Sequence, residues 1–517
     1  MSDTSTRILK NTSFLYGKMI TTFVVALYTA RVCLNVLGAS DYGLYTLIAG
    51  VIFMFGFLQD TLTRSTLRYL CYYKTQNNIL YQTKVYSISI FLHLAIALVI
   101  IFNLLLVTNF LFSGFLKIDP DRIYAAKMVY FCMIASFSFT VMSVPYDSVL
   151  NANEDMLYYS LVGIIENILK LGLAFYLPFV EYDPLIFFSV VSACITILSL
   201  LVKRIYCHMK YEECKISFRY YDKKLAAKMV SYAGWNFLTS ISSLISFNMM
   251  PILLNRFFGT IANAAQGVAG MVNGNLTAFS TNMLKALNPT IAKAGSGNDI
   301  ARMLRFGFTG SKLAFLITGI LSLPILIECP YVLRIWLINV PAWTTVFCVL
   351  LIIRSLSDQL ITVFSDCVYA NEDIKDYCIV KSIFNILPIF IVYISFKFGA
   401  GPYVLYIALF ICWELLGGIV IIYYTKKMYE LNLGEYCTTL LVPCLSSFAI
   451  ACVPGFMVVY MIDESFYRLI LTTSVSVLVL LITSWRYVFD QNERVLVGQM
   501  LSGLKKGFYN ESRRLFN

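Results

Sequence analysis

The tetrapeptide Ala152-Asn153-Glu154-Asp155 occurs a second time in the chain, as Ala370-Asn371-Glu372-Asp373, 218 positions later. At the same offset, the downstream Asn167-Ile168-Leu169 returns as Asn385-Ile386-Leu387. Chance similarity between two apolar helices is the alternative, and the polar identities kept in one register argue against it. The repeat predicts an internal duplication, which constrains the fold before any local signal does.

A second pair of similar segments lies upstream, at nearly the same distance. Leu34-Asn35 followed by Gly38 resembles Leu254-Asn255 followed by Gly259. Two separate echoes at nearly one offset strengthen the prediction that the chain consists of two related halves.

The composition excludes a soluble domain. The chain has 517 residues, of which 59% are hydrophobic and only 13% are charged, whereas ordinary globular chains are about 25% charged. Long apolar runs recur along its whole length, and the alternating segments of a membrane barrel are absent. Met1 to Lys10 lacks a signal-peptide layout, so we expect the first span to be kept. The sequence predicts an all-α polytopic membrane protein.

The apolar runs predict about 14 transmembrane helices. Their approximate limits are 12–37, 43–67, 85–112, 125–149, 157–178, 184–203, 229–257, 262–288, 306–331, 343–368, 375–396, 403–424, 437–460 and 466–487.

The duplicated tetrapeptide lies six spans from its copy, an even number, so both halves have the same orientation. This predicts two parallel six-helix lobes plus two C-terminal helices, a known transporter architecture. We expect an N-lobe in 1–205, a basic cytoplasmic inter-lobe loop in 206–228 and a C-lobe in 229–425. The last two spans and a basic tail follow in 426–517.

Lys and Arg residues predict the orientation. Of the 40, 25 lie in or at the edge of segments on the side of the N-terminus, and 6 lie on the other side. By the positive-inside rule both termini are cytoplasmic, so the net charge of +11 needs no nucleic-acid partner. The tail 496–516 is basic and amphipathic, and it either lies on the anionic inner leaflet or is solvated.

The cysteines and histidines indicate neither a metal nor another cofactor. Most of the 14 cysteines sit inside apolar runs, where they act as small buried hydrophobes. His93 lies inside a span, where both a packed histidine and a proton relay are open interpretations.

Nine basic residues fall within spans, and each would cost roughly 2.5–3.5 kcal/mol at mid-bilayer. Three pairs of opposite charges lie four positions apart on one helix face. They are Asp60 with Arg64, Glu166 with Lys170, and Arg354 with Asp358. Glu328 lies near a span end and is expected to reach the headgroups. Basic residues without a local partner must face a wet cavity or meet an anion from elsewhere; they are Lys18, Arg31, Lys285, Lys312 and Lys381.

The first span carries one continuous polar face. On a helical wheel, Lys18, Thr21, Tyr28, Arg31 and Asn35 fall within an arc of about 140°. The face lines either a cavity or a buried seam between helices.

The eighth span is unusually rich in Asn and Gln. Gly270 and Gly274 form a GxxxG packing motif, but the amides around Asn273 exceed what packing needs. We therefore include Asn273 among the candidate cavity residues.

Several motifs resemble one family. They are Tyr28-Thr29-Ala30-Arg31, Leu34-Asn35-Val36-Leu37-Gly38, Asp41-Tyr42-Gly43-Leu44-Tyr45 and Ala152-Asn153-Glu154-Asp155-Met156. These motifs and the 6+6+2 layout are similar to those of the Wzx-type flippases, the O-antigen and capsule repeat-unit exporters of the MOP superfamily.

The resemblance implies a two-lobe flippase with a central cationic cavity in the bacterial inner membrane. Its substrate would be an undecaprenyl-diphosphate-linked oligosaccharide, carried from the cytoplasmic to the periplasmic leaflet for surface polysaccharide biosynthesis. Related lipid II flippases have essential basic residues in spans one, two and eight. The matching candidates for the diphosphate here are Lys18, Arg31, Arg64 and Lys285. Other polysaccharide assembly proteins are possible partners.

Energy coupling and function leave alternatives open. Asp60, Glu166 and Asp358 are candidate sites for protons or sodium ions, and no P-loop for ATP is visible. A multidrug or cation antiporter of the same fold is one alternative, although it would want unpaired carboxylates. A polysaccharide polymerase is less favoured because the outer loops are short, so we expect a transporter and no enzyme.

Overall fold

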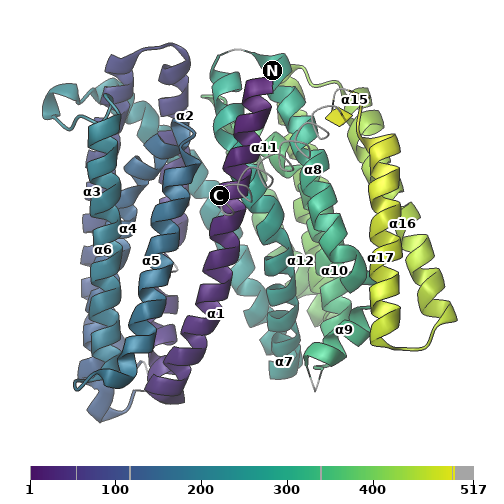
Figure 1. Ribbon diagram of the computed structural model, residues 1–517, viewed down its shortest axis with the longest axis horizontal. Coiled ribbons are helices and arrows are strands. Elements are labelled where there is room, and N and C mark those ends of the chain that lie inside the picture. The colour runs from purple at the N-terminus through teal and green to yellow at the C-terminus, as the bar shows by residue number, and fades with distance from the viewer. Residues whose placement is uncertain are drawn as a thin grey trace, which may run out of the picture. The chain divides into compact units, whose positions relative to one another are not determined.

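The computed structural model describes residues 2–53, 55–115, 118–297, 299–337, 340–491 and 493–494, with only the backbone for some of them. Throughout these ranges the secondary structure is helical, without a β-strand (Figure 1). The predicted basic tail 496–516 lies outside the described residues. The side chains of Arg31 and Asp60 also lie outside them.

The chain divides into two compact units. The N-terminal unit comprises residues 13–237, and the C-terminal unit comprises residues 238–517 with the first twelve residues. The division falls inside α7 (Lys223–Ser296), so the first turns of that helix pack with the N-terminal unit.

Six helices build most of the N-terminal unit. They are α1 (Ser2–Phe53), α2 (Gly56–Thr75), α3 (Ile79–Phe110), α4 (Ile123–Ala152), α5 (Met156–Tyr176) and α6 (Pro184–Lys210). Its core lies against α4, where Ala126, Val129 and Val141 are fully buried and pack near Ile48 and Leu185.

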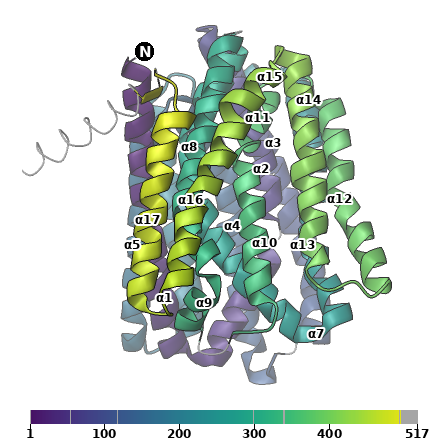
Figure 2. The same cartoon turned by 90° about the vertical axis from the view of Figure 1, so that its right-hand side faces the viewer.

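The remaining helices build the C-terminal unit together with most of α7. They are α8 (Ile300–Ile327), α9 (Cys329–Trp336), α10 (Thr344–Gln359), α11 (Thr362–Tyr369), α12 (Lys375–Lys397), α13 (Val404–Leu409), α14 (Gly417–Tyr429), α15 (Leu433–Tyr436), α16 (Val442–Met461) and α17 (Phe466–Thr483). A π-helical stretch, η5 (Phe410–Leu416), joins α13 to α14. The hairpin of α16 and α17 packs against α8 (Figure 2).

The two sequence echoes occupy corresponding places in the two units. Gly38 breaks α1 with φ 76° and ψ 170°, and Gly259 breaks α7 with φ 75° and ψ −170°. Glycine populates this region without a Cβ penalty, which explains the residue at both bends. The tetrapeptides form the α4–α5 turn and the α11–α12 turn.

Ten helices of the described residues are long and apolar enough to cross a membrane, or eleven if the bent pair α10–α11 counts as one span. Within α1, only Phe14–Val25 qualifies, as a shorter apolar helix, and the half of α7 after Gly259 is absent from the ten. The breaks at Gly38 and Gly259 divide α1 and α7 into two helical parts each. The prediction of an all-α polytopic membrane protein is confirmed.

Candidate functional site

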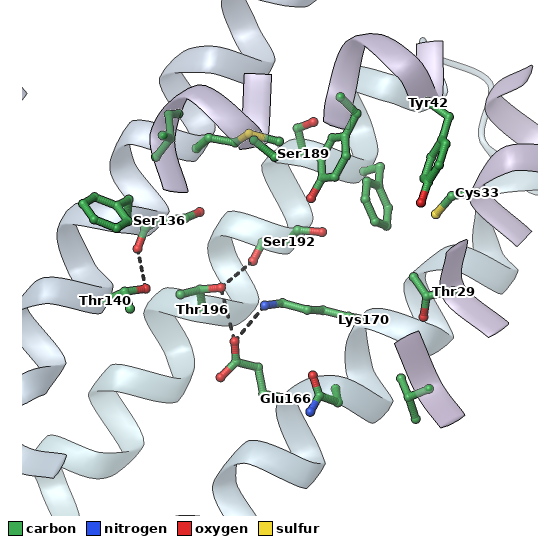
Figure 3. Close-up of a pocket in the computed structure, with 18 of the residues that line it drawn as sticks. Thr29, Cys33, Tyr42, Ser136, Thr140, Glu166, Lys170, Ser189, Ser192 and Thr196 are labelled. Carbon is green, nitrogen blue, oxygen red and sulfur yellow. Dashed lines mark hydrogen bonds and ion pairs between the residues drawn. The ribbon is translucent and has the colours of Figure 1, made fainter. Parts of the chain in front are cut away.

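A cavity of about 530 Å³ lies inside the N-terminal unit, between α1, α4, α5 and α6 (Figure 3). Thr29 and Cys33 line it before the helix break at Gly38, and Tyr42 lines it after the break. The cavity therefore lies in the half of the unit that is nearest this break, which the Lys and Arg distribution predicts to be the outer half.

One ion pair is the only charged element among the residues that line this cavity. Lys170 Nζ lies 2.7 Å from Glu166 Oε1, one turn away on α5. The hydroxyl of Thr196 on α6 lies 3.4 Å from the same carboxylate oxygen and 3.1 Å from the carbonyl of Ser192 (Figure 3). The expected pairing of Glu166 with Lys170 is thus formed, and the pair leaves the cavity without net charge.

Hydroxyl groups supply most of the remaining polarity. Several are used locally: Thr140 donates to the carbonyl of Ser136 at 2.9 Å, and Ser189 donates to that of Leu185 at 2.9 Å. In contrast, the buried hydroxyls of Thr29 and Ser192 have no hydrogen-bond partner among the described residues. Because buried polar groups are normally satisfied, these two hydroxyls are suited to hydrogen-bond water or a polar guest in the cavity.

Arg122 links several segments at this end of the unit through ion pairs. Its Nε lies 2.9 Å from Asp41 Oδ1, and its Nη1 lies 2.6 Å from Asp183 Oδ2. Asp183 also caps α6, accepting from the amide of Leu185 at 3.0 Å. One guanidinium therefore fastens the second half of α1 and the starts of α4 and α6.

Lys18 lies near the opposite, predicted cytoplasmic, end of the unit. Its Nζ is 3.8 Å from the centroid of the Tyr159 ring, a cation–π contact. A Cβ at Gly163 would lie 2.4 Å from Lys18 Cε, so the glycine makes room for the lysine. Lys203 is 5.5 Å from the same ring and pairs with Asp147 at 2.8 Å. Lys18 itself has no carboxylate partner among the described residues.

The described members of the predicted polar face of the first span differ in exposure, and Lys18 packs on Tyr159. Tyr28 and Asn35 are exposed, and Thr21 is half-buried. The buried positions of the helix include Leu15, Val25 and Cys33.

The other candidates for the diphosphate lie in both units. Arg64 is exposed on α2 in the N-terminal unit, and Lys285 is exposed on α7 in the C-terminal unit. Asn273, also on α7, accepts a hydrogen bond from Ser355 of α10 at 2.5 Å. Asn273 is therefore engaged with a neighbouring helix, and its role at a cavity stays a prediction.

The C-terminal unit contains a buried charge cluster at η5. Arg354 Nε lies 3.0 Å from Glu414 Oε1, and its guanidinium lies over the ring of Trp413 at 4.7 Å. Lys381 donates to the carbonyl of Trp413 at 3.4 Å. The expected pairing of Arg354 with Asp358 is wrong, because Glu414 reaches Arg354 from η5. Among the described residues Asp358 forms no ion pair.

Two buried ion pairs attach α17 and the residues after it to α8. Arg468 binds both oxygens of Glu328, at 2.8 and 2.6 Å, which corrects the expectation that Glu328 reaches the headgroups. Lys312 lies 2.7 Å from Glu493, and both side chains are 4% exposed. Lys312 thus meets an anion from a distant part of the chain, one of the two outcomes that the sequence left open.

The sequence signal for these long-range contacts was weak. Charges are common at span ends, where Arg122, Asp147, Lys203 and Arg468 lie, and their partners are 56 to 140 positions away in the chain. The sequence identifies charges at span ends as candidates for ion pairs. It does not identify their partners, because the partner depends on helix packing.

No protein-family model and no curated protein matches the sequence of this chain. Solved structures do match. A crystal structure of MATE in the straight conformation has a TM-score of 0.71 at 13% identity, covering 83% of this chain and 96% of that chain. An outward-facing multidrug resistance MATE family transporter of the MOP superfamily gives the same values.

A further match is a MOP superfamily transporter from Pyrococcus furiosus Vc1 (DSM3638), described as having a binding pocket of reverse polarity that suggests a different function. Its TM-score is 0.71 at 13% identity, and it covers the same shares of the two chains. At this identity the likeness concerns the fold. The chain has the fold of MATE family transporters of the MOP superfamily.

Proposed function

We propose that this chain is a transporter that moves undecaprenyl-diphosphate-linked oligosaccharide repeat units from the cytoplasmic to the periplasmic leaflet of a bacterial inner membrane. The sugar head would pass through a cationic cavity while the lipid tail stays in the bilayer. The MOP-superfamily fold supports a transporter over an enzyme, and the sequence motifs support the flippase class.

The charge balance of the membrane-spanning helices is the observation that carries the proposal. Among the described residues Asp358 forms no ion pair, but five other deep or span-end carboxylates each have a basic partner within 3.0 Å; they are Asp147, Glu166, Glu328, Glu414 and Glu493. In contrast, Lys18 and Lys285 have no carboxylate partner among the described residues. Unpaired cations are costly in a membrane, and an anionic substrate is a reason to keep them. A diphosphate matches this need.

We assign the diphosphate to Lys18, Arg31, Arg64 and Lys285, which lie on the helices that the resemblance implicates. Thr21, Tyr28, Asn35 and Asn273 would contact the sugar. Arg can bind phosphate oxygens in a bidentate manner, and Lys acts as a point charge. Rocking of the two halves would give alternating access.

The identity of the substrate is tested by depletion of the protein in its host, followed by mass spectrometry of lipid extracts. We expect undecaprenyl-diphosphate-linked repeat units to accumulate while surface polysaccharide is lost. Unchanged lipid-linked saccharides and normal polysaccharide would contradict the proposal.

A multidrug antiporter is the second candidate, because matched structures include multidrug MATE transporters and Glu166 lies in a cavity. An antiporter would require a carboxylate whose ion pair with its basic partner opens. Drug-resistance assays with the parent and with Glu166→Gln separate the two. Resistance conferred by the parent and lost in the variant would favour the antiporter.

Coupling to protons or sodium ions would use Glu166, Asp60 or Asp358. In proteoliposomes, we expect the rate of flipping to respond to an imposed pH gradient, sodium gradient or membrane potential. Glu166→Gln should reduce that response more than Thr140→Val, a matched change in the same cavity. A parent rate that is indifferent to all three gradients would remove the coupling role.

A further inference from the structure

We propose that residues 204–224, which comprise the last two turns of α6, the connection to α7 and the first two residues of α7, form a membrane-surface anchor that binds anionic phospholipid headgroups at the predicted cytoplasmic end of the N-terminal unit. The proposal requires only that the chain spans a membrane. It does not depend on the transported substrate.

Two apolar stripes lead to this segment. On α3, Leu94, Leu98 and Phe102 are exposed at four-residue spacing. On α6, Ile205 and Met209 extend the exposed face to the end of the helix, with Met209 84% exposed. Exposed apolar stripes on membrane-spanning helices face lipid, so the hydrocarbon surface reaches both edges of the segment.

Phe218 continues the stripe of α3 beyond the helix. Its ring stacks on that of Phe91 with centroids 4.4 Å apart, and Phe91 precedes Leu94 by one turn. Phe218 is nevertheless 80% exposed. An aromatic ring in this position suits the boundary between hydrocarbon and headgroups better than open water.

The turn that carries Phe218 is fixed by hydrogen bonds. Ser87 of α3 donates to the carbonyl of Ser217 at 3.0 Å and accepts from its amide at 3.2 Å. Lys84 of α3 pairs with Asp222 at 3.1 Å. Phe218 is therefore presented by a short 3₁₀ turn, Phe218–Tyr220, that is attached to α3 on both sides.

Basic side chains surround the apolar groups. The exposed ones are Arg204, Lys215, Arg219, Lys223 and Lys224, together with Lys210, which pairs with Asp155. Of the three carboxylates in the segment, Glu212 is exposed, Asp222 pairs with Lys84, and Glu213 accepts from Asn153 at 3.0 Å. The exposed surface of the segment is therefore mainly cationic with interleaved apolar groups. This is the chemistry that anionic headgroups over hydrocarbon recognise.

The position of Phe218 is tested with the full-length protein in vesicles of equal parts phosphatidylcholine and phosphatidylglycerol. Phe218→Trp adds one tryptophan to the five of the chain, and the parent signal is subtracted. We expect the added fluorescence to be quenched by nitroxides attached high on the lipid chains and shielded from aqueous acrylamide. Quenching by acrylamide alone would overturn the proposal and indicate a surface for a protein partner.

The headgroup contact is tested by titrating short-chain phosphatidylglycerol into the detergent-purified protein and following thermal stabilisation. Each basic residue near an anionic surface is worth a factor of roughly five in binding. We expect Lys215→Gln/Arg219→Gln to weaken the apparent affinity by about 30-fold. The matched control is Lys127→Gln/Lys397→Gln, two lysines at the predicted outer ends of α4 and α12. Equal losses in both variants, or none in the first, would overturn the proposal.

Discussion

At the residue scale, the deepest charges are stabilised by specific partners. Glu328 is 1% exposed and Arg468 is 6% exposed, and the guanidinium binds both carboxylate oxygens. Burying either charge alone would be costly, because the low-dielectric surroundings favour the charged form only when it is paired.

Removing one member of this pair is predicted to be more harmful than removing both. Glu328→Leu leaves Arg468 buried without its counter-ion, Arg468→Leu does the same to Glu328, and such losses cost about 3–5 kcal/mol. The double variant Glu328→Leu/Arg468→Leu should cost less than either single change. Thermal unfolding in detergent measures all four proteins, and strictly additive effects would show that the two side chains do not interact.

The contacts of Asp155, a residue of the repeated tetrapeptide, are predicted to make the α4–α5 turn sensitive to acid. Burial alone would raise the pKa of its carboxyl. Lys210, Tyr206 and Tyr211 donate to it at 2.7, 2.7 and 2.8 Å, outweigh burial and lower the pKa below its ordinary value.

A lowered pKa in the folded state means that Asp155 contributes stability above its unfolded pKa of about 3.9. That contribution is lost as the pH falls through the lower folded value. The difference in melting temperature between the parent and Asp155→Asn should be largest at neutral pH and should vanish in strong acid. Asp373→Asn in the second copy is the control, since Asp373 accepts only from the backbone amide of Lys375 among the described contacts. A difference that grows toward acid pH would contradict this assignment.

Sequence alone could predict contacts within one helix but not those between distant helices. Glu166 and Lys170 are one turn apart, so their spacing determined the pair. Arg354 had two acidic candidates as partners. It pairs with Glu414 and not with Asp358, four residues away on the same helix, because the packing of the helices brings Glu414 to the guanidinium. Acidic residues are favoured at a helix N-terminus. Asp155 does lie at the N-cap of α5, but its carboxylate binds the end of α6 and no side-chain cap bond forms.

At the element scale, the two glycine breaks are the clearest structural trace of the duplication. Both bends have φ near 75° and extended ψ. The sequence predicted related halves, and the glycines show where each long helix is broken. The span limits near them were less predictable, because a single residue separates the two helical parts at each break.

Alanine at either bend is predicted to strain the backbone. A Cβ at Gly38 or Gly259 meets no atom within 4 Å, so the cost is conformational, about 1–3 kcal/mol. Gly267→Ala is the matched control, because Gly267 lies in the helical part of α7 with similarly free space and alanine favours helix there by roughly 1 kcal/mol. Melting temperatures should fall for the first two variants by similar amounts and not for the third. Equal effects of all three would contradict the role of the bends.

At the scale of the whole molecule, the fold supplies two related units with different polar interiors. The N-terminal unit has a cavity with a neutralised ion pair, and the C-terminal unit has a buried cluster at η5. The lysines without carboxylate partners, Lys18 and Lys285, lie one in each unit. On the proposed function, these two lysines are candidates for contact with the anionic diphosphate.

The most direct measurement is a flipping assay in proteoliposomes that contain purified protein and an undecaprenyl-diphosphate-linked oligosaccharide. A glycosidase added outside reports the fraction of sugar heads that reach the outer leaflet. We predict that the parent exposes the inner pool and that Lys18→Glu/Lys285→Glu slows this by at least tenfold. Lys426→Glu/Lys427→Glu, with the same change in charge at the end of α14, should keep the parent rate. No transport by the parent, or a parent-like rate in the Lys18/Lys285 variant, would contradict the account.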